Sequence, residues 1–291
     1  MSNIILGTAQ FGEKYGLSQS NIISLNLIRK IVSFAAKNKI KFIDTAPFYG
    51  NAEKKLGKCK LKKFKIISKI KLPKKINYET LVKVCETIVN SYKDLKNKSI
   101  YGILIHNPKV MKNYNVNELK ALIETFNFLK KKKFFKHVGI SIYHKNEILK
   151  SYDMFPIKIL QAPYNIFDRR FTHKRFLNYC KKKKIILIGR SIFLQGLLIN
   201  EGYQDKPFFK KKSYILKKYF NYLKKIQSNG LNACLNFALT NKIKRFVVGI
   251  DNLNQLKEIL NFKRKKINFP KFLNESKNAD LILPINWNLK N

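Results

Sequence analysis

The sequence predicts a single-domain (β/α)8 barrel, the TIM-barrel fold, over residues 1–291. Three observations predict it. A chain of 291 residues suits one large α/β barrel. Short apolar runs alternate with amphipathic stretches about eight times along the chain. Most of these runs are continuously apolar, as parallel strands covered on both faces should be.

The predicted elements follow in the order strand, then helix. Apolar runs predict strands at residues 4–6, 41–44, 65–69, 101–106, 138–141, 159–161, 185–190 and 246–249. Apolar residues at helical spacing predict helices at residues 22–39, 78–92, 117–132, 145–152, 174–183, 214–227, 231–240 and 254–260. No Pro/Gly/Ser-rich linker, repeat or low-complexity segment interrupts the alternation, so we expect one domain.

Two other nucleotide-binding folds do not fit the sequence. A Rossmann fold needs a GxGxxG motif after an early strand, and none is present. A P-loop needs four residues between its glycines and a Ser or Thr after the Lys. Here six residues separate Gly50 from Gly57, and Cys59 follows Lys58.

The chain is strongly basic, with a formal net charge of +43. Such a charge attracts polyanions, so nucleic-acid binding stays open as an alternative. We favour compositional drift, because Lys outnumbers Arg and Asn, Ile, Phe and Tyr are abundant, as in AT-rich genomes. The Lys runs at residues 130–133, 181–184 and 210–212 fall near predicted helix ends, where cations suit the helix dipole.

The cysteines and the N-terminus indicate no redox motif, metal site or export signal. Successive cysteines lie at least 26 positions apart, which excludes CxxC pairs. We therefore expect reduced thiols at Cys59, Cys85, Cys180 and Cys234, and no bound metal. No leader pattern and no run of about 20 apolar residues is present, so we expect a cytoplasmic chain without a membrane partner.

Polar residues follow three consecutive predicted strands. Asp44, Tyr49, Lys69 and His106 close or follow the runs FI, KIIS and ILI. The carboxyl ends of strands in a parallel barrel converge at one mouth, so we expect these side chains to be neighbours. Each residue alone has an ordinary structural explanation, such as a helix cap, a core tyrosine or a surface lysine. The four together favour a site.

Their chemistry can be argued from residue type. A Tyr hydroxyl has a pKa of about 10, and a nearby cation such as Lys69 favours the phenolate and lowers that pKa. A buried Lys needs a counter-ion, which Asp44 on the adjacent strand supplies. His106 can then donate a hydrogen bond to a substrate oxygen.

The same residues resemble the aldo/keto reductase superfamily. The resemblance rests on LGTAQFG at 6–12, FIDTAPFYGNAEKKLG at 42–57, ISKIK at 67–71 and ILIHNP at 103–108, and it continues through GISIY, QAPYNIFDRR, GRSIFLQGLL and VVGIDNLNQLKEIL. It implies NAD(P)H-dependent reduction of an aldehyde or ketone. Tyr49 would be the proton donor, Lys69 and Asp44 would tune and hold it, and His106 would orient the carbonyl.

The resemblance also implies a nicotinamide cofactor, NADP(H) or NAD(H), and the residues that bind it. These are Gly7, Thr8, Ser141, Gln161, Arg190, Ser191, Gly249, Asp251, Gln255 and Glu258. Three positions depart from the family pattern. Ile142 and Ile259 replace asparagines, and Arg190 replaces an aromatic residue that stacks on the nicotinamide, although a guanidinium plane can also stack.

Asp251 lies close to where family members place basic residues for the 2′-phosphate of NADPH. A carboxylate there should repel a phosphate, so we predict weak discrimination or a preference for NADH. The alternative is that Asp251 points outward and that Lys244, Arg245 or Lys257 meets the phosphate.

The expected partner is a small carbonyl substrate. GRSIFLQGLL resembles members encoded with bacterial surface-sugar pathways, which suggests a phosphorylated or nucleotide-linked sugar. The expected substrate pocket comes from residues 164–170, 197–212 and 281–287, with Trp287 lining it. We expect a monomer or a weak homo-oligomer. The alternative function is a catalytically slow, nicotinamide-binding redox-sensing or accessory subunit.

Overall fold

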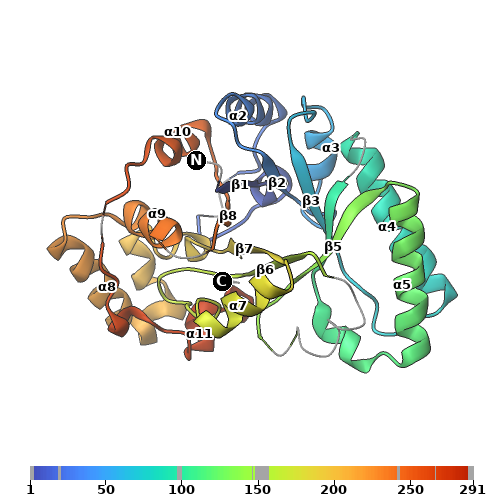
Figure 1. Cartoon of the computed structure of the whole chain (residues 1–291). Helices are drawn as coiled ribbons and strands as arrows, with labels where there is room; N and C mark the ends of the chain where they lie inside the picture. The colour runs from blue at the N-terminus through green and yellow to red at the C-terminus, as the bar shows by residue number, and fades with distance from the viewer. Residues whose placement is uncertain are drawn as a thin grey trace.

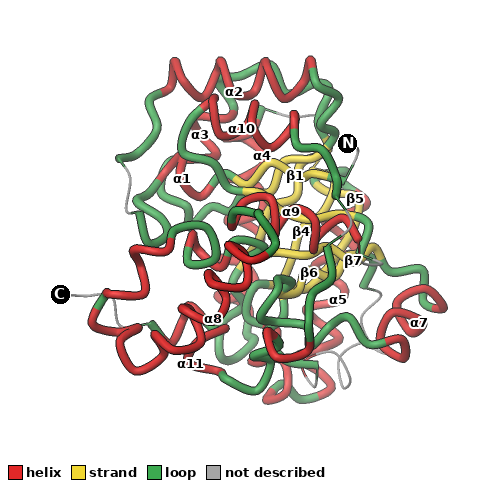
Figure 2. The backbone as a smooth tube through the Cα atoms, turned by 90° about the vertical axis from the view of Figure 1, so that its left-hand side faces the viewer, coloured by secondary structure: helices red, strands yellow, loops and turns green. Residues whose placement is uncertain are grey.

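Eight parallel strands close into a barrel in chain order, which confirms the predicted (β/α)8 fold. The computed structural model describes residues 3–18, 21–96, 100–145, 147, 157–240, 243–265 and 267–287. Its strands are β1 Ile4–Gly7, β2 Phe42–Asp44, β3 Lys65–Ile70, β4 Ile100–Ile105, β5 Phe135–Ser141, β6 Ile159–Pro163, β7 Ile186–Arg190 and β8 Arg245–Val248. Figure 2 shows these strands at the centre, with helices and loops around them.

Helices cover the outside of the barrel (Figure 1). The α-helices are α1 Ala9–Gly12, α2 Leu25–Lys37, α3 Ala52–Leu56, α4 Tyr78–Leu95, α5 Val116–Lys131, α7 Lys174–Lys182, α8 Ser213–Lys225, α9 Gly230–Thr240, α10 Leu253–Asn261 and α11 Ala279–Ile282. Short 3-10 helices span Pro108–Asn113, Leu194–Gly196, Glu201–Asp205, Pro207–Lys212, Lys271–Leu273 and Pro284–Asn286. The helix predicted at 145–152 lies mostly outside the described residues. No helix within the described ranges is long and apolar enough to cross a membrane.

Side-chain caps set the helix starts that apolar spacing could not place. The Ser24 hydroxyl accepts a hydrogen bond from the Leu27 amide, so α2 begins at Leu25 rather than at residue 22. Asn77 and Asn115 form capping boxes at the starts of α4 and α5. The prediction for α4 was right at its start, but the helix runs three residues beyond the predicted end at 92.

The apolar side chains form two separate layers. A small cluster fills the barrel interior, and a much larger one lies between the strands and the helices. Successive side chains on a strand point to opposite faces, so one strand supplies both layers. The interior cluster consists of Ile5, Phe42, Ile67, Leu104, Ile159 and Ile188.

Aromatic rings and cations close the amino-terminal end of the barrel. The Lys65 ammonium lies 5.2 Å from the centre of the Tyr101 ring, and the Arg245 guanidinium lies 5.2 Å from that of Phe42. The two side chains cover the rings of Phe42 and Tyr101, which belong to or pack against the interior cluster. The opposite, carboxyl-terminal end is therefore the one left open for a site.

Candidate active site

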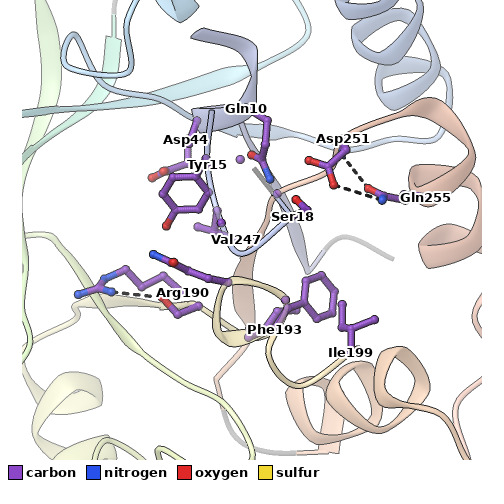
Figure 3. Close-up of a pocket in the computed structure, with 18 of the residues that line it drawn as sticks. Gln10, Tyr15, Ser18, Asp44, Arg190, Phe193, Ile199, Val247, Asp251 and Gln255 are labelled. Carbon is purple, nitrogen blue, oxygen red and sulfur yellow. Dashed lines mark hydrogen bonds between the residues drawn. The ribbon is translucent and has the colours of Figure 1, made fainter. Parts of the chain in front are cut away.

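The site residues continue the inward-facing row of each strand. A strand side chain and the one two positions later share a face, so the residue two positions after each interior hydrophobe points to the barrel axis, one layer higher. Applied to the six interior hydrophobes, this step leads to Gly7, Asp44, Lys69, His106, Gln161 and Arg190. Applied to Val247 of β8, which packs against their cluster, it leads to Gly249. All seven line one cavity of about 580 Å³, part of which is shown in Figure 3.

Lys69 is buried and paired. Its ammonium lies 2.5 Å from Asp44 Oδ1 and donates a second hydrogen bond, 3.0 Å long, to the Thr45 carbonyl. The other Asp44 oxygen accepts a hydrogen bond from Gln161 Nε2 at 2.7 Å. Burial alone would lower the pKa of Lys69, but Asp44 and Tyr49 together raise it above its ordinary value, so the amine stays charged.

Tyr49 lies beside this cation, with the Lys69 ammonium 4.8 Å from the centre of its ring. We expected the cation to lower the pKa of Tyr49. The structure shows the opposite net direction, because burial raises the pKa of the phenol by more than Lys69 lowers it. The Tyr49 hydroxyl is therefore held in its protonated form, which is the form that can donate a proton.

Close backbone packing fixes the loop that carries Tyr49. Gly50 has a φ of +53°, and a Cβ added at Gly12 would lie 1.8 Å from the Tyr49 carbonyl oxygen. The helix that follows is tied to the next strand, because the Ser68 hydroxyl donates a 2.6 Å hydrogen bond to the buried Glu53 carboxylate. This bond holds α3 against β3. It therefore fixes the Tyr49 loop, which precedes α3, relative to Lys69, which follows Ser68 on β3.

His106 directly follows β4 and faces the same cavity. Burial, together with the nearby cations Lys69 and Arg190, lowers the pKa of His106 to about 3. Its imidazole is therefore neutral near pH 7, with one N–H left to donate. The His106 ring lies 4.9 Å from that of Phe48, centre to centre, which holds it beside the Tyr49 loop.

Arg190, the last residue of β7, stands between the strand ends and the cavity. Its guanidinium lies 4.1 Å from the centre of the Tyr143 ring. It donates hydrogen bonds to the Ile142 carbonyl at 3.2 Å and to the Ser191 hydroxyl at 3.3 Å. One face of the guanidinium is thus covered by Tyr143.

Asp251, in the loop after β8, and Gln255, in the first turn of α10, are joined by two hydrogen bonds. The Asp251 amide donates to Gln255 Oε1 at 2.7 Å, and Gln255 Nε2 donates to the Asp251 carboxylate at 3.3 Å (Figure 3). Both residues line the cavity, as does Glu258. Lys244, Arg245 and Lys257 are not among its lining residues. This end of the cavity therefore presents two carboxylates.

Of the remaining residues predicted to bind a cofactor, two line the cavity and one does not. Thr8 and Ser191 line the cavity, whereas Ser141 does not. The Ser141 hydroxyl is buried on β5 beside Gln161, and no partner for it exists among the described residues.

Residues 3–270 match the aldo/keto reductase family. The chain belongs to this family. Two solved structures of related fold are a glycerol dehydrogenase from Gluconobacter oxydans and an aldo-keto reductase from Bacillus halodurans in its holo form. The first is 17% identical with a TM-score of 0.67, over 97% of this chain and 91% of that one. The second is 18% identical with a TM-score of 0.68, over 93% and 90%. No curated protein matches the chain significantly by sequence.

Membership makes the chain an oxidoreductase of a family that acts on carbonyl substrates with nicotinamide cofactors. The comparisons give the family and the fold.

Sequence reasoning missed part of the cavity wall of this aldo/keto reductase. Tyr15 and Gln195 lie on the loops after β1 and β7, and these loops are joined by a hydrogen bond from the Leu17 amide to the Gln195 carbonyl. Ser191, Leu194 and Gln195 all have positive φ. The position of these loops after barrel strands was the available signal.

The predicted substrate loops were right only in part. Residues Ile199, Asn200 and Tyr203 of the 197–212 segment line the cavity, but nothing from 164–170 or 281–287 does. The prediction that Trp287 lines the pocket was wrong. Its ring packs edge-on against Phe209 at 4.9 Å, and its indole N–H donates to the Asp280 carbonyl. This position suits Trp287 because it buries the apolar ring and gives the single N–H donor a partner.

Proposed function

We propose that this aldo/keto reductase reduces an aldehyde or ketone to an alcohol, with Tyr49 as the proton donor. The bound nicotinamide would supply the hydride. The observation that carries the proposal is the buried chain Asp44–Lys69–Tyr49, which ends at the wall of the cavity. It brings one protonated phenol to the cavity wall, where a carbonyl oxygen can approach.

The four residues have separate roles in this proposal. The Lys69 cation stabilises the negative charge that develops on Tyr49 as its proton leaves for the substrate oxygen. Asp44 keeps Lys69 charged and in place through the 2.5 Å contact. The neutral His106 donates a hydrogen bond that orients the carbonyl.

The residues fit a nicotinamide cofactor. Ser141 offers a buried hydroxyl that has no partner within the described residues, beside the amide of Gln161, which suits a carboxamide. Gly7 and Gly249 line the cavity with backbone alone, and a Cβ at either would lie less than 3.0 Å from a neighbouring side chain. We assign Thr8, Ser191, Gln255 and Glu258 to the cofactor as well, and the open face of Arg190 to the nicotinamide.

We predict that the enzyme binds NADH at least as tightly as NADPH. Asp251 lines the cavity. The three cations considered as alternative contacts for the 2′-phosphate, Lys244, Arg245 and Lys257, do not. Arg245 instead covers Phe42 at the other end of the barrel. Asp251→Lys should improve NADPH binding relative to NADH by about tenfold, or about 1.4 kcal/mol. Fluorescence titration with each cofactor measures this ratio.

Asp280→Lys is the matched control, because it makes the same charge change on α11, outside the cavity. It should leave the ratio of the two dissociation constants unchanged. Wild-type binding of NADPH that is about tenfold tighter than binding of NADH would contradict the proposal.

The substrate we propose is a polar carbonyl compound, such as a phosphorylated or nucleotide-linked sugar. Arg190 supplies a cation next to Tyr49, and the hydroxyls of Tyr15 and Tyr143 lie in the same wall. The test is a screen of sugar phosphates, nucleotide sugars and simple aldehydes that follows nicotinamide absorbance. We expect saturable turnover in the sugar classes. No saturable turnover in any class would favour the sensing or accessory role.

A further inference from the structure

The outer face of α4 and α5 carries exposed apolar side chains. Tyr78 is 83% exposed and Val82 37% exposed on α4, and Phe128 is 57% exposed on α5. An open groove between the two helices is lined by Tyr78, Val82 and Cys85 from α4 and by Thr125 from α5, one turn before Phe128. Figure 1 shows the two helices side by side at one edge of the molecule.

This face is also neutral in a chain of +43. Helices α4 and α5 together hold five Lys and five Asp or Glu residues. Helices α2, α7 and α8, of almost the same combined length, hold eleven Lys or Arg residues and no acid. The apolar groove thus lies on one of the described helical surfaces where acidic residues balance the lysines.

We propose that the α4/α5 face, defined by Tyr78, Val82, Cys85, Val89, Thr125 and Phe128, is the contact between two copies of this chain in a two-fold dimer. In such a dimer the same patch meets itself, so a patch with equal numbers of Lys and acidic residues can pair its charges, whereas a purely cationic patch would repel its own copy. Charges farther away than about 8 Å are screened at physiological ionic strength. The charge of the patch itself therefore decides whether two copies can meet.

The charge pattern indicates which partner binds to the α4/α5 face. A polyanion would bind to α2, α7 or α8, where cations are dense and the helices themselves carry no acid. A neutral apolar face gains little from a polyanion and most from another neutral apolar face. The 18 residues of α4 extend about 27 Å, so two antiparallel copies of the face can meet along its whole length.

The dimer leaves the active site open. None of the six residues that define the α4/α5 face lines the catalytic cavity. Helices α4 and α5 pack on the outside of β3 and β5, whereas the cavity opens at the strand ends. Dimer formation and carbonyl reduction can therefore be measured separately.

The test is sedimentation velocity of the full chain over a wide concentration range, at low and high salt. We expect a monomer–dimer equilibrium that persists or tightens in high salt, because salt screens the repulsion between two cationic chains. Tyr78→Lys and Val82→Lys should each raise the dimer dissociation constant at least tenfold. Circular dichroism should confirm that both variants stay folded, since both side chains are exposed.

Tyr214→Lys is the matched control. Tyr214 is 73% exposed near the start of the cationic helix α8, so the same substitution removes an equally exposed ring from a different face. It should leave the dissociation constant unchanged. A monomer at every concentration, equal effects of Tyr78→Lys and Tyr214→Lys, or association that requires nucleic acid and dissolves in high salt would each overturn the proposal.

Discussion

Tyr49→Phe should lower turnover by about 10²–10⁴-fold, the usual contribution of a positioned general acid. The substitution removes the Tyr49 hydroxyl beside the Lys69 cation and leaves the ring that packs against Phe48. Cofactor binding should persist, because the proposed cofactor contacts come from other strands. Steady-state kinetics and a nicotinamide fluorescence titration on the same preparation separate the two effects.

Tyr15 provides the comparison, because it is a second phenol in the same cavity. Burial raises the pKa of Tyr15 by more than the Arg190 cation lowers it, and the Lys69 ammonium lies over the ring of Tyr49 instead. Tyr15→Phe should therefore change KM more than kcat. If Tyr15→Phe abolished turnover while Tyr49→Phe retained most of it, the proton donor would be Tyr15.

Asp44→Asn should destabilise the fold by about 3–5 kcal/mol, as expected when one partner of a buried ion pair is removed. The side chain of Lys69 is 2% exposed, so without the carboxylate its charge is neither paired nor solvated. The pKa of Lys69 should then fall, since burial lowers it and Asp44 opposes that effect. Chemical denaturation measures the change in the free energy of unfolding.

Glu201→Gln is the matched control, because it breaks the exposed ion pair between Glu201 and Lys224 and should cost about 1 kcal/mol or less. The double variant Asp44→Asn/Lys69→Met should recover most of the lost stability, since it removes the stranded charge. If Asp44→Asn cost no more than Glu201→Gln, Lys69 would not be held by Asp44 as described.

Much of the site could be predicted because each strand of a parallel barrel ends at the same mouth. Asp44, Lys69 and His106 were found from their positions at the ends of apolar runs, without knowledge of any contact. The same reasoning missed Tyr15 and Gln195, which lie in loops. Their approach depends on long-range contacts between the two loops, such as the hydrogen bond from the Leu17 amide to the Gln195 carbonyl.

The sequence by itself determined the alternation of strands and helices, and hence the barrel, because the strand and helix periods are local properties of the chain. It also determined which residue types stand at the strand ends. Only the tertiary structure decided the direction of the Tyr49 pKa, because burial and the Lys69 cation act in opposite directions and their balance depends on how much water the fold removes. It likewise placed Trp287 against Phe209 rather than in the cavity, since the packing of the C-terminal segment depends on contacts far apart in the chain.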